Sequence, residues 1–399
     1  MHRQLTVDLR ATPCSLLLAF ALAMALPGCK SAPPPPPKPE LALQKLASRG
    51  YTAERHNDTT AVRETWLDGE APLDVSLIAP TGSGRFPLVI YLPGLGESAA
   101  AGVLWRQAWA ESGYAVLAIQ PVVLGESVFR SQKARSGDFL GLAQEHYSIP
   151  SLKVRTQHLS YALEELKRRA GAGAGLYSKI DLRRLALAGF DLGAQSVAVL
   201  VGERIGDAGS IATHLNLRAA ILLSPYVDRS ASGATQRFSA ITVPVLSVTG
   251  TEDADPFGLV SVPELRRRPW QDMPAGDKYL LLLAGGPHGV LAGEGFAEAG
   301  HESRADDTAK EAAARPQGAG RQRGQRGSGG SQAASQRMGA GDGGAIRGTR
   351  TFEIAHIAAV RGVTTAFLDA TVKDDAGARE WLGKDAATWL GQSARLETR

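Results

Sequence analysis

Six residues decide the fold of this chain: Gly189-Phe190-Asp191-Leu192-Gly193-Ala194. An apolar run at 185–188 precedes them, and a second apolar stretch at 195–200 follows. This pattern predicts a strand, a sharp Gly-x-x-x-Gly turn and a helix, which together form the setting of a nucleophile elbow. The two glycines are needed because the strained turn has no room for Cβ atoms. Ser usually occupies the middle position, and here the residue is Asp191.

Apolar runs and helical patterns alternate on both sides of this turn. The alternation predicts an α/β fold with a mostly parallel sheet and helices on both faces. Residues 60–66 and 72–78 are expected to form an antiparallel hairpin, whereas 121–150 lack periodicity and are interpreted as a lid or loop. Further strands are expected at 87–91, 114–119, 185–188, 219–223, 243–249 and 279–283, the last of the sheet.

Two helical patterns have a clear apolar face. Ser151 is expected to cap a helix that places Leu152, Leu159, Leu163 and Leu166 on one side. Another helix is expected near 100–111. Two more helices, near 352–370 and 376–392, close the chain, and the first should pack on the sheet through Ile354, Ile357, Ala358, Val363 and Phe367.

The N-terminus has the pattern of an export signal. Arg3 and Arg10 precede an apolar segment at 14–26, which is too short for a confident membrane span. It ends in Leu-Pro-Gly-Cys29, which resembles a bacterial lipobox. We therefore expect a signal peptide at 1–28 and a lipid on Cys29, with an ordinary secretory signal as the alternative. Cleavage would discard Cys14, so that no disulfide could form.

A Pro-rich tether is expected to follow the lipid attachment site, over residues 29–48. It contains five consecutive prolines at 33–37, and such a run favours an extended, stiff polyproline II conformation. Lys30, directly after Cys29, is consistent with sorting to the outer membrane by resemblance to other bacterial lipoproteins. The expected location is thus the bacterial cell envelope, with the membrane as a partner through the anchor.

Residues 301–348 interrupt the α/β pattern. Gly, Ala, Gln, Arg and Ser dominate there, which predicts a disordered insertion between two parts of one domain, 49–300 and 349–396. Residues 302–350 hold nine Lys or Arg against five Asp or Glu, which equals the net charge of +4 of the whole chain. The rest of the chain is therefore neutral, and no nucleic-acid partner is expected.

Three polar positions follow predicted strands in the order nucleophile, acid, base. Asp191 occupies the elbow, a carboxylate follows 244–250, and His288 lies in a Gly-rich turn after the last strand. Such a His needs a carboxylate to fix its tautomer and to stabilise its protonated form. Asp253 and Asp255 both suit the acid position, and we favour Asp253. The sequence shows no spacing typical of a metal site, and no cofactor is expected.

These stretches, together with Tyr91-Leu-Pro-Gly-Leu-Gly96, Leu223-Ser-Pro-Tyr226 and Val248-Thr-Gly-Thr-Glu-Asp253, resemble the α/β-hydrolase superfamily, nearest to its branch of dienelactone hydrolases and platelet-activating-factor acetylhydrolase-like proteins. The resemblance implies a single α/β-hydrolase domain acting on a small molecule. It also implies that Asp253 is the acid, His288 the base, and the N–H groups of Leu95 and Leu192 the oxyanion hole.

Asp191 in place of Ser leaves two functions open. The first is a hydrolase of an ester, lactone or similar small substrate that uses an Asp191–His288–Asp253 triad. In dehalogenases and epoxide hydrolases of this superfamily an Asp attacks saturated carbon, and water activated by His then cleaves the ester. The second is an inactive, lipid-anchored binding protein, because a negative charge opposes a developing oxyanion.

Overall fold

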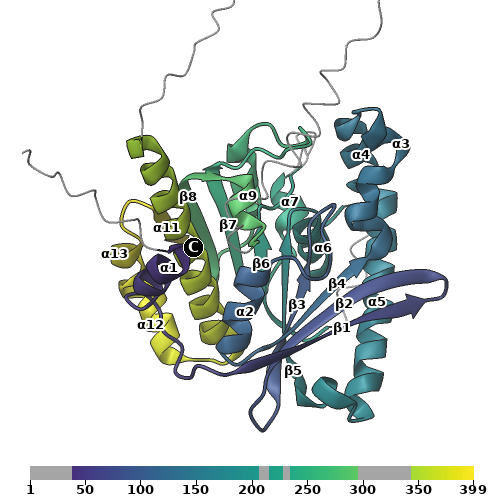
Figure 1. Ribbon diagram of the computed structural model, residues 1–399, viewed down its shortest axis with the longest axis horizontal. Helices are drawn as coiled ribbons and strands as arrows, with labels where there is room; N and C mark the ends of the chain where they lie inside the picture. Colours follow the sequence, from purple (N-terminus) through teal and green to yellow (C-terminus); the bar gives the residue numbers. More distant parts are fainter. Residues whose placement is uncertain (1–37, 206–214, 228–233, 295–342) are drawn as a thin grey trace, which may run out of the picture. The chain divides into compact units, whose positions relative to one another are not determined.

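The computed structural model describes residues 38–205, 215–227, 234–294 and 343–399. Within them, nine strands form one sheet in the order β1-β2-β4-β3-β5-β6-β7-β8-β9 (Figure 1). The six strands from β4 to β8 run parallel, whereas β1, β2 and β9 pair antiparallel at the two edges. The strands are β1 (Thr59–Asp68), β2 (Ala71–Pro80), β3 (Phe86–Leu92), β4 (Ala115–Pro121), β5 (Ile180–Phe190), β6 (Leu217–Leu223), β7 (Val245–Glu252), β8 (Lys278–Pro287) and β9 (Ala394–Thr398).

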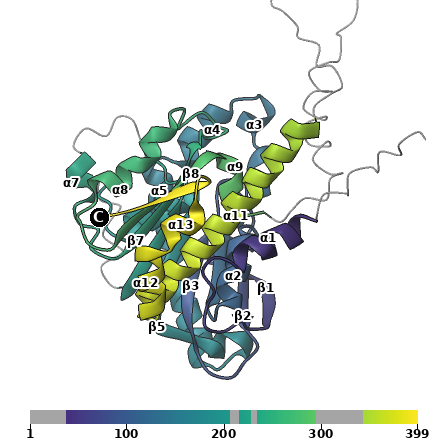
Figure 2. The same ribbon diagram turned by 90° about the vertical axis from the view of Figure 1, so that its left-hand side faces the viewer.

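Helices cover both faces of the sheet, as predicted. On one face the long helix α11 crosses the strands beside α1, α2 and α12 (Figure 2); α5 and α6 cover the other face. Successive side chains of a strand point to opposite faces, so Val116 and Ala118 of β4 join one core and Leu117 and Ile119 the other. These helices are α1 (Pro39–Ala47), α2 (Val103–Glu111), α5 (Ile149–Gly171), α6 (Leu192–Leu200), α11 (Gly343–Val372) and α12 (Ala376–Lys384).

The glycines of the elbow are required by close approaches of backbone. A Cβ atom on Gly193 would collide with the carbonyl group of Leu92 at the end of β3. A Cβ atom on Gly189 would come within 2.5 Å of the carbonyl carbon of Gly193. The turn between β5 and α6 thus lies directly against β3, which brings the ends of these two strands together.

Several elements differ from the sequence-based expectation. Residues 121–150 form short helices: η1 (Val122–Leu124), η2 (Glu126–Arg130), α3 (Gln132–Arg135) and α4 (Phe139–His146). Helix α5 begins earlier than predicted, and its cap is Ser148, whose hydroxyl accepts from the N–H of Ser151. The strand predicted at 279–283 is not the last, because β9 pairs with it at the sheet edge.

Two predicted domain boundaries are also wrong. The tether was expected to reach residue 48, but 39–47 form helix α1, and Leu43 is buried in the core because it packs against α11. The disordered insertion was expected to reach residue 348, but α11 already begins at Gly343. The expected core positions of α11 are confirmed, since Ile357, Ala358, Val363 and Phe367 are buried and Ile354 is partly buried.

The remaining predictions for the N-terminus and for the insertion lie outside the described residues. These are the signal peptide, Cys14, the lipid attachment at Cys29 and the tether up to residue 37, together with 301–342 of the insertion. In the part of the chain that is described, no helix has both the length and the apolar character needed to cross a membrane.

Gly193→Ala should destabilise the protein by about 1–3 kcal/mol or more, because the backbone of β3 cannot retreat from the added Cβ. Gly383→Ala is the matched control, since this exposed glycine of α12 has nothing within 4 Å of its Cβ position. The control should be more stable to unfolding by about 0.5–1 kcal/mol, because Ala has a better helix propensity than Gly. Denaturant unfolding measures both. Equal stability of the two variants would contradict the close approach.

Candidate functional site

Five neighbouring parallel strands end at one edge of the sheet, and a polar residue follows each of them. These residues are Glu97, in the loop after β3, and Asp191, Ser224, Asp253 and His288, which directly follow β5, β6, β7 and β8. The chain leaves β3 through α2 on one face and leaves β5 through α6 on the other. Ligands of open α/β sheets bind where adjacent connections diverge in this way, outside the carboxyl ends of the strands.

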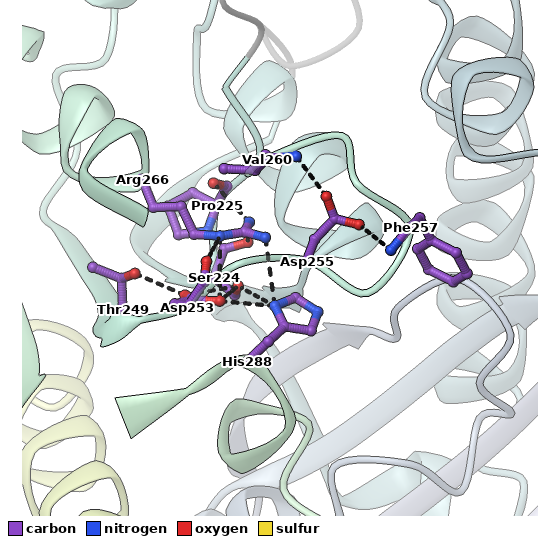
Figure 3. Close-up of polar contacts among 9 residues, drawn as sticks. All are labelled: Ser224, Pro225, Thr249, Asp253, Asp255, Phe257, Val260, Arg266 and His288. Atoms are coloured by element: carbon purple, nitrogen blue, oxygen red, sulfur yellow. Dashed lines mark hydrogen bonds and ion pairs between the residues drawn. The ribbon is translucent and has the colours of Figure 1, made fainter. Parts of the chain in front are cut away.

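His288 and Asp253 form a hydrogen-bonded pair at this edge of the sheet. Nδ1 of His288 lies 2.8 Å from Oδ1 of Asp253, which is fully buried. The hydroxyl of Ser224 lies 2.7 and 2.9 Å from the two carboxylate oxygens and 2.9 Å from Nδ1 of His288 (Figure 3). Thr249 donates to Oδ2 at 2.7 Å. The imidazole is thus held by Nδ1, which leaves Nε2 for chemistry.

Arg266 holds the Asp253–His288 pair in place. Its guanidinium is fully buried and donates to the carbonyl oxygens of Ser224 (2.8 Å), Pro225 (3.2 Å) and Asp253 (2.8 Å), as Figure 3 shows. It also lies 3.2 Å from Oδ1 of Asp253 as an ion pair. Burial acts to raise the pKa of Asp253, but the hydrogen bond with His288 and the charge of Arg266 outweigh it and hold that pKa below its ordinary value.

Asp191 occupies a strained and buried position beside this pair. Its backbone has φ 51° and ψ −106°, outside the regions that L-residues favour, and only 4% of the residue is exposed. The ring of Phe190 packs on His288 with centroids 5.0 Å apart. Burial raises the pKa of Asp191 and outweighs the charges of His288 and Arg266 and a hydrogen bond from Tyr147, which act in the opposite direction. The pKa of this carboxyl therefore lies above its ordinary value.

The structure separates the two candidate acids. Asp255 accepts hydrogen bonds from the backbone N–H groups of Phe257 and Val260, at 2.7 and 2.5 Å, and so holds together the turn after β7. Its carboxylate points away from His288, toward this turn (Figure 3). Asp253, which the sequence analysis favoured, is the one that contacts the imidazole.

Leu95 and Leu192, the expected oxyanion donors, lie in one buried apolar cluster. Leu192 is the first residue of α6, where backbone N–H groups lack partners within the helix. Leu95 lies in the loop after β3, whose conformation is fixed by the buried side-chain amide of Gln120. Leu192 directly follows Asp191 in the chain, and its side chain packs in the same cluster as that of Leu95.

The loop after β3 also holds a carboxyl group, that of Glu97. Oε2 of Glu97 accepts the N–H of Gly94 at 2.7 Å. The pKa of Glu97 is raised to about 8, chiefly by burial and also by the negative charges of Asp191 and Glu294, against a hydrogen bond from Gly94 that lowers it. Glu97 is therefore largely protonated at neutral pH, in contrast to an ordinary surface Glu.

Sequence reasoning missed Ser224, Arg266 and Glu97. Ser224 stands directly after β6, and this placement was the available signal. Arg266 lies in η5 (Pro263–Arg267), 13 positions beyond Asp253, and nothing local marks it as buried. Glu97 lies in a stretch whose sequence indicates only backbone donors, and no local pattern marks its carboxyl as buried.

A scan against protein-family models finds no match for this chain, and a search of curated proteins finds no significant match either. Among the residues that the structure describes, no group of three or more His, Cys, Asp or Glu side chains is arranged to hold a metal ion. The interpretation of the site therefore depends on its own geometry.

Arg266→Met should destabilise the protein by about 3–5 kcal/mol, because it leaves Asp253 buried without its cationic partner and frees three carbonyl groups. Arg268→Met is the control: Arg268 is 44% exposed and pairs with Asp272 on the surface, so its loss should cost less than about 1 kcal/mol. Thermal and denaturant unfolding measure both. A small effect at Arg266 would show that the buried pair is not a stabilising element.

Proposed function

We propose that this protein is a hydrolase of a small substrate, that its domain is an α/β-hydrolase domain, and that Asp191, His288 and Asp253 are its catalytic residues. The observation that carries the proposal is the strained Asp191 beside a preassembled Asp253–His288 pair. The order of the three residues along the chain, each after a parallel strand, matches that of the superfamily.

The strain at Asp191 supports an active role. A non-glycine residue in such a backbone region costs about 1–3 kcal/mol, and such residues persist mainly at functional sites. A Gly at position 191 would remove the backbone strain. A carboxyl group without a function would more easily lie on the surface than in this buried position. Burial raises the pKa of Asp191 above its ordinary value, and the hydrogen bond from Tyr147 and the nearby charges of His288 and Arg266 offset part of this cost of the ionised, nucleophilic form.

The geometry divides the chemistry between the three residues. Asp253 accepts the Nδ1–H of His288 and thereby selects the tautomer that has a basic Nε2. Asp191 either attacks an electrophilic carbon, which forms an ester that His288-activated water then hydrolyses, or acts as a base on water directly. In the first case the proton of the attacking water passes to Nε2 of His288, and Asp253 stabilises the resulting imidazolium.

A lipid-anchored binding protein is the alternative, because the carboxylate of Asp191 lies where an ester substrate would develop negative charge. For either function we propose that the chain is exported, acylated on Cys29 and held in the cell envelope at the outer membrane. The small-molecule ligand and the membrane would then be its two partners.

Asp191→Ala should abolish turnover, with a loss of about 10⁴-fold or more in kcat, and His288→Ala should do the same. The measurement uses the purified protein with nitrophenyl esters, lactones, haloalkanes and epoxides. If His288→Ala accumulates a covalent adduct on Asp191 that mass spectrometry detects, the carboxylate is the nucleophile. A wild-type protein that is inert, together with an Asp191→Ser variant that gains esterase activity, would instead establish the binding function.

Asp253→Asn should lower kcat by about 10⁴-fold, because the amide no longer holds His288 in the reactive tautomer. Asp255→Asn is the matched control on the same loop. It should keep its activity and lose only stability, since Asp255 contacts backbone N–H groups rather than the imidazole. The same kinetic assay tests both, and a reversed order of the two effects would refute the assignment of the acid.

A further inference from the structure

A cavity of about 720 Å³ opens on the face of the sheet that α11 covers. Its walls are formed by α1, α2 and α11, which lie side by side in Figure 2, by the loop from 48 to 56, and by Trp389 of α13 (Ala386–Leu390). No residue of the proposed triad is among the described residues that line it. Small-molecule sites have volumes of about 300–1,000 Å³, so the cavity is large enough to hold a ligand.

One wall of the cavity is the indole ring of Trp389, whose position is fixed by two glycines. A Cβ atom on Gly362 of α11 would lie 2.9 Å from this ring, and a Cβ atom on Gly50 would collide with it. The missing side chains therefore let the indole lie against the backbone of both segments. Leu43 of α1 and Leu104 of α2 also line the cavity, which gives it an apolar as well as an aromatic surface.

The guanidinium of Arg361 lines the cavity with most of its hydrogen-bonding capacity unused. Only 26% of this side chain is exposed, yet its one partner among the described residues is Glu111, with 3.5 Å between Nη2 and Oε2. Charge-assisted hydrogen bonds of this kind are about 2.7–2.9 Å long, so the pair is loose. Burial lowers the pKa of Arg361 more than the charge of Glu111 raises it, which indicates that the cation has too few negative partners.

Thr365 adds a second unused polar group beside this guanidinium. It lies one turn after Arg361 on the same face of α11, lines the cavity, and is only 6% exposed. Its hydroxyl has no hydrogen-bond partner in the part of the chain that the structure describes, whereas that of the adjacent Thr364 bonds to Val360 and Trp109. A buried hydroxyl without a partner is costly. A ligand that accepts from Thr365 and Arg361 would remove this cost.

Unused donors outnumber unused acceptors in the cavity. Arg55 and His56, both exposed, line it and have no hydrogen bond or ion pair with any described residue. Of the two lining carboxylates, Glu111 already accepts from Gln107 at 3.0 Å. The other, Glu40, lies in the first turn of α1, where the helix dipole stabilises it. The cavity therefore suits a ligand that supplies acceptors and negative charge.

The loose ion pair also limits the charge of that ligand. Glu111 lies next to Arg361 and would repel a second negative charge, so a dianionic phosphate is disfavoured. A carboxylate carries a single charge, and its two oxygens match the planar fork of a guanidinium. The aromatic and apolar walls can then hold the organic body of the same molecule.

We propose that this cavity is a second ligand site, separate from the site of Asp191, and that it binds a small carboxylate with an aromatic or apolar body. The guanidinium of Arg361 and the hydroxyl of Thr365 bind the carboxylate, and the body packs on Trp389 and on the leucines of α1 and α2. The site does not depend on the proposed hydrolase function, because none of its residues belongs to the triad.

Isothermal titration calorimetry of the purified protein with naphthoate tests this site, and the neutral naphthamide is the matched ligand without charge. Arg361→Gln should weaken naphthoate binding by about 10–100-fold, because hydrogen bonds between charged partners are the strong ones, and should leave naphthamide binding unchanged. Thr365→Val keeps the shape of the side chain and should weaken naphthoate binding by about 2–10-fold. It should not lower the unfolding temperature of the free protein, because the lost hydroxyl has no partner there among the described residues.

Arg49→Gln is the matched control, because Arg49 is exposed just after α1 but does not line the cavity. It should bind naphthoate like the wild type. Unchanged naphthoate binding in Arg361→Gln or in Thr365→Val, tighter binding of inorganic phosphate than of naphthoate, or no binding at millimolar concentration overturns the inference. Binding that is lost in His288→Ala but kept in Arg361→Gln would place the anion in the site of Asp191 and overturn it as well.

Discussion

The buried guanidinium of Arg266 holds the Asp253–His288 pair of this site in place. Arg266 joins the ends of β6 and β7 through the carbonyl groups of Ser224, Pro225 and Asp253 and also neutralises the carboxylate that orients His288. A buried cation is costly unless every donor finds an acceptor, and here the loop ends supply them. Because these contacts cross between strands, the positions of the acid and of the base are set together. The nucleophile candidate is placed independently, by the contact of the elbow with β3.

The parts of the site that could be predicted are those that depend on local backbone rules. Gly189 and Gly193 mark a turn in which Cβ atoms cannot fit, and the structure contains these close approaches. Asp253 and His288 each come a few residues after an apolar run, so the strand pattern alone places them at the same edge of the sheet. Their pairing depends on β7 and β8 being neighbours in the sheet, which the alternation of strands and helices does not specify.

The rest depends on contacts between segments that no local pattern reveals. Arg266 reaches Asp253 only because the loop after β7 folds back, and the pKa of Glu97 is raised only because burial and two other carboxyls act on it. The strand at 394–398 was missed because five residues with mixed polarity carry little signal of their own; pairing with β8 defines it. Likewise, α1 is a short segment that is held by packing on α11, more than by its own propensity.

Both edges of the sheet have features that oppose self-association. Exposed strand edges invite pairing with another chain, and charged side chains discourage it. The outer strand β1 presents Arg63, more than half exposed and paired with Asp74 of β2. At the opposite edge β9 presents Arg395 and Glu397, which pair along the strand, and it is only five residues long. Neither edge of the sheet is therefore a long apolar strand that could pair with another copy. We expect the protein to remain monomeric even at the high local concentration that attachment to a surface creates.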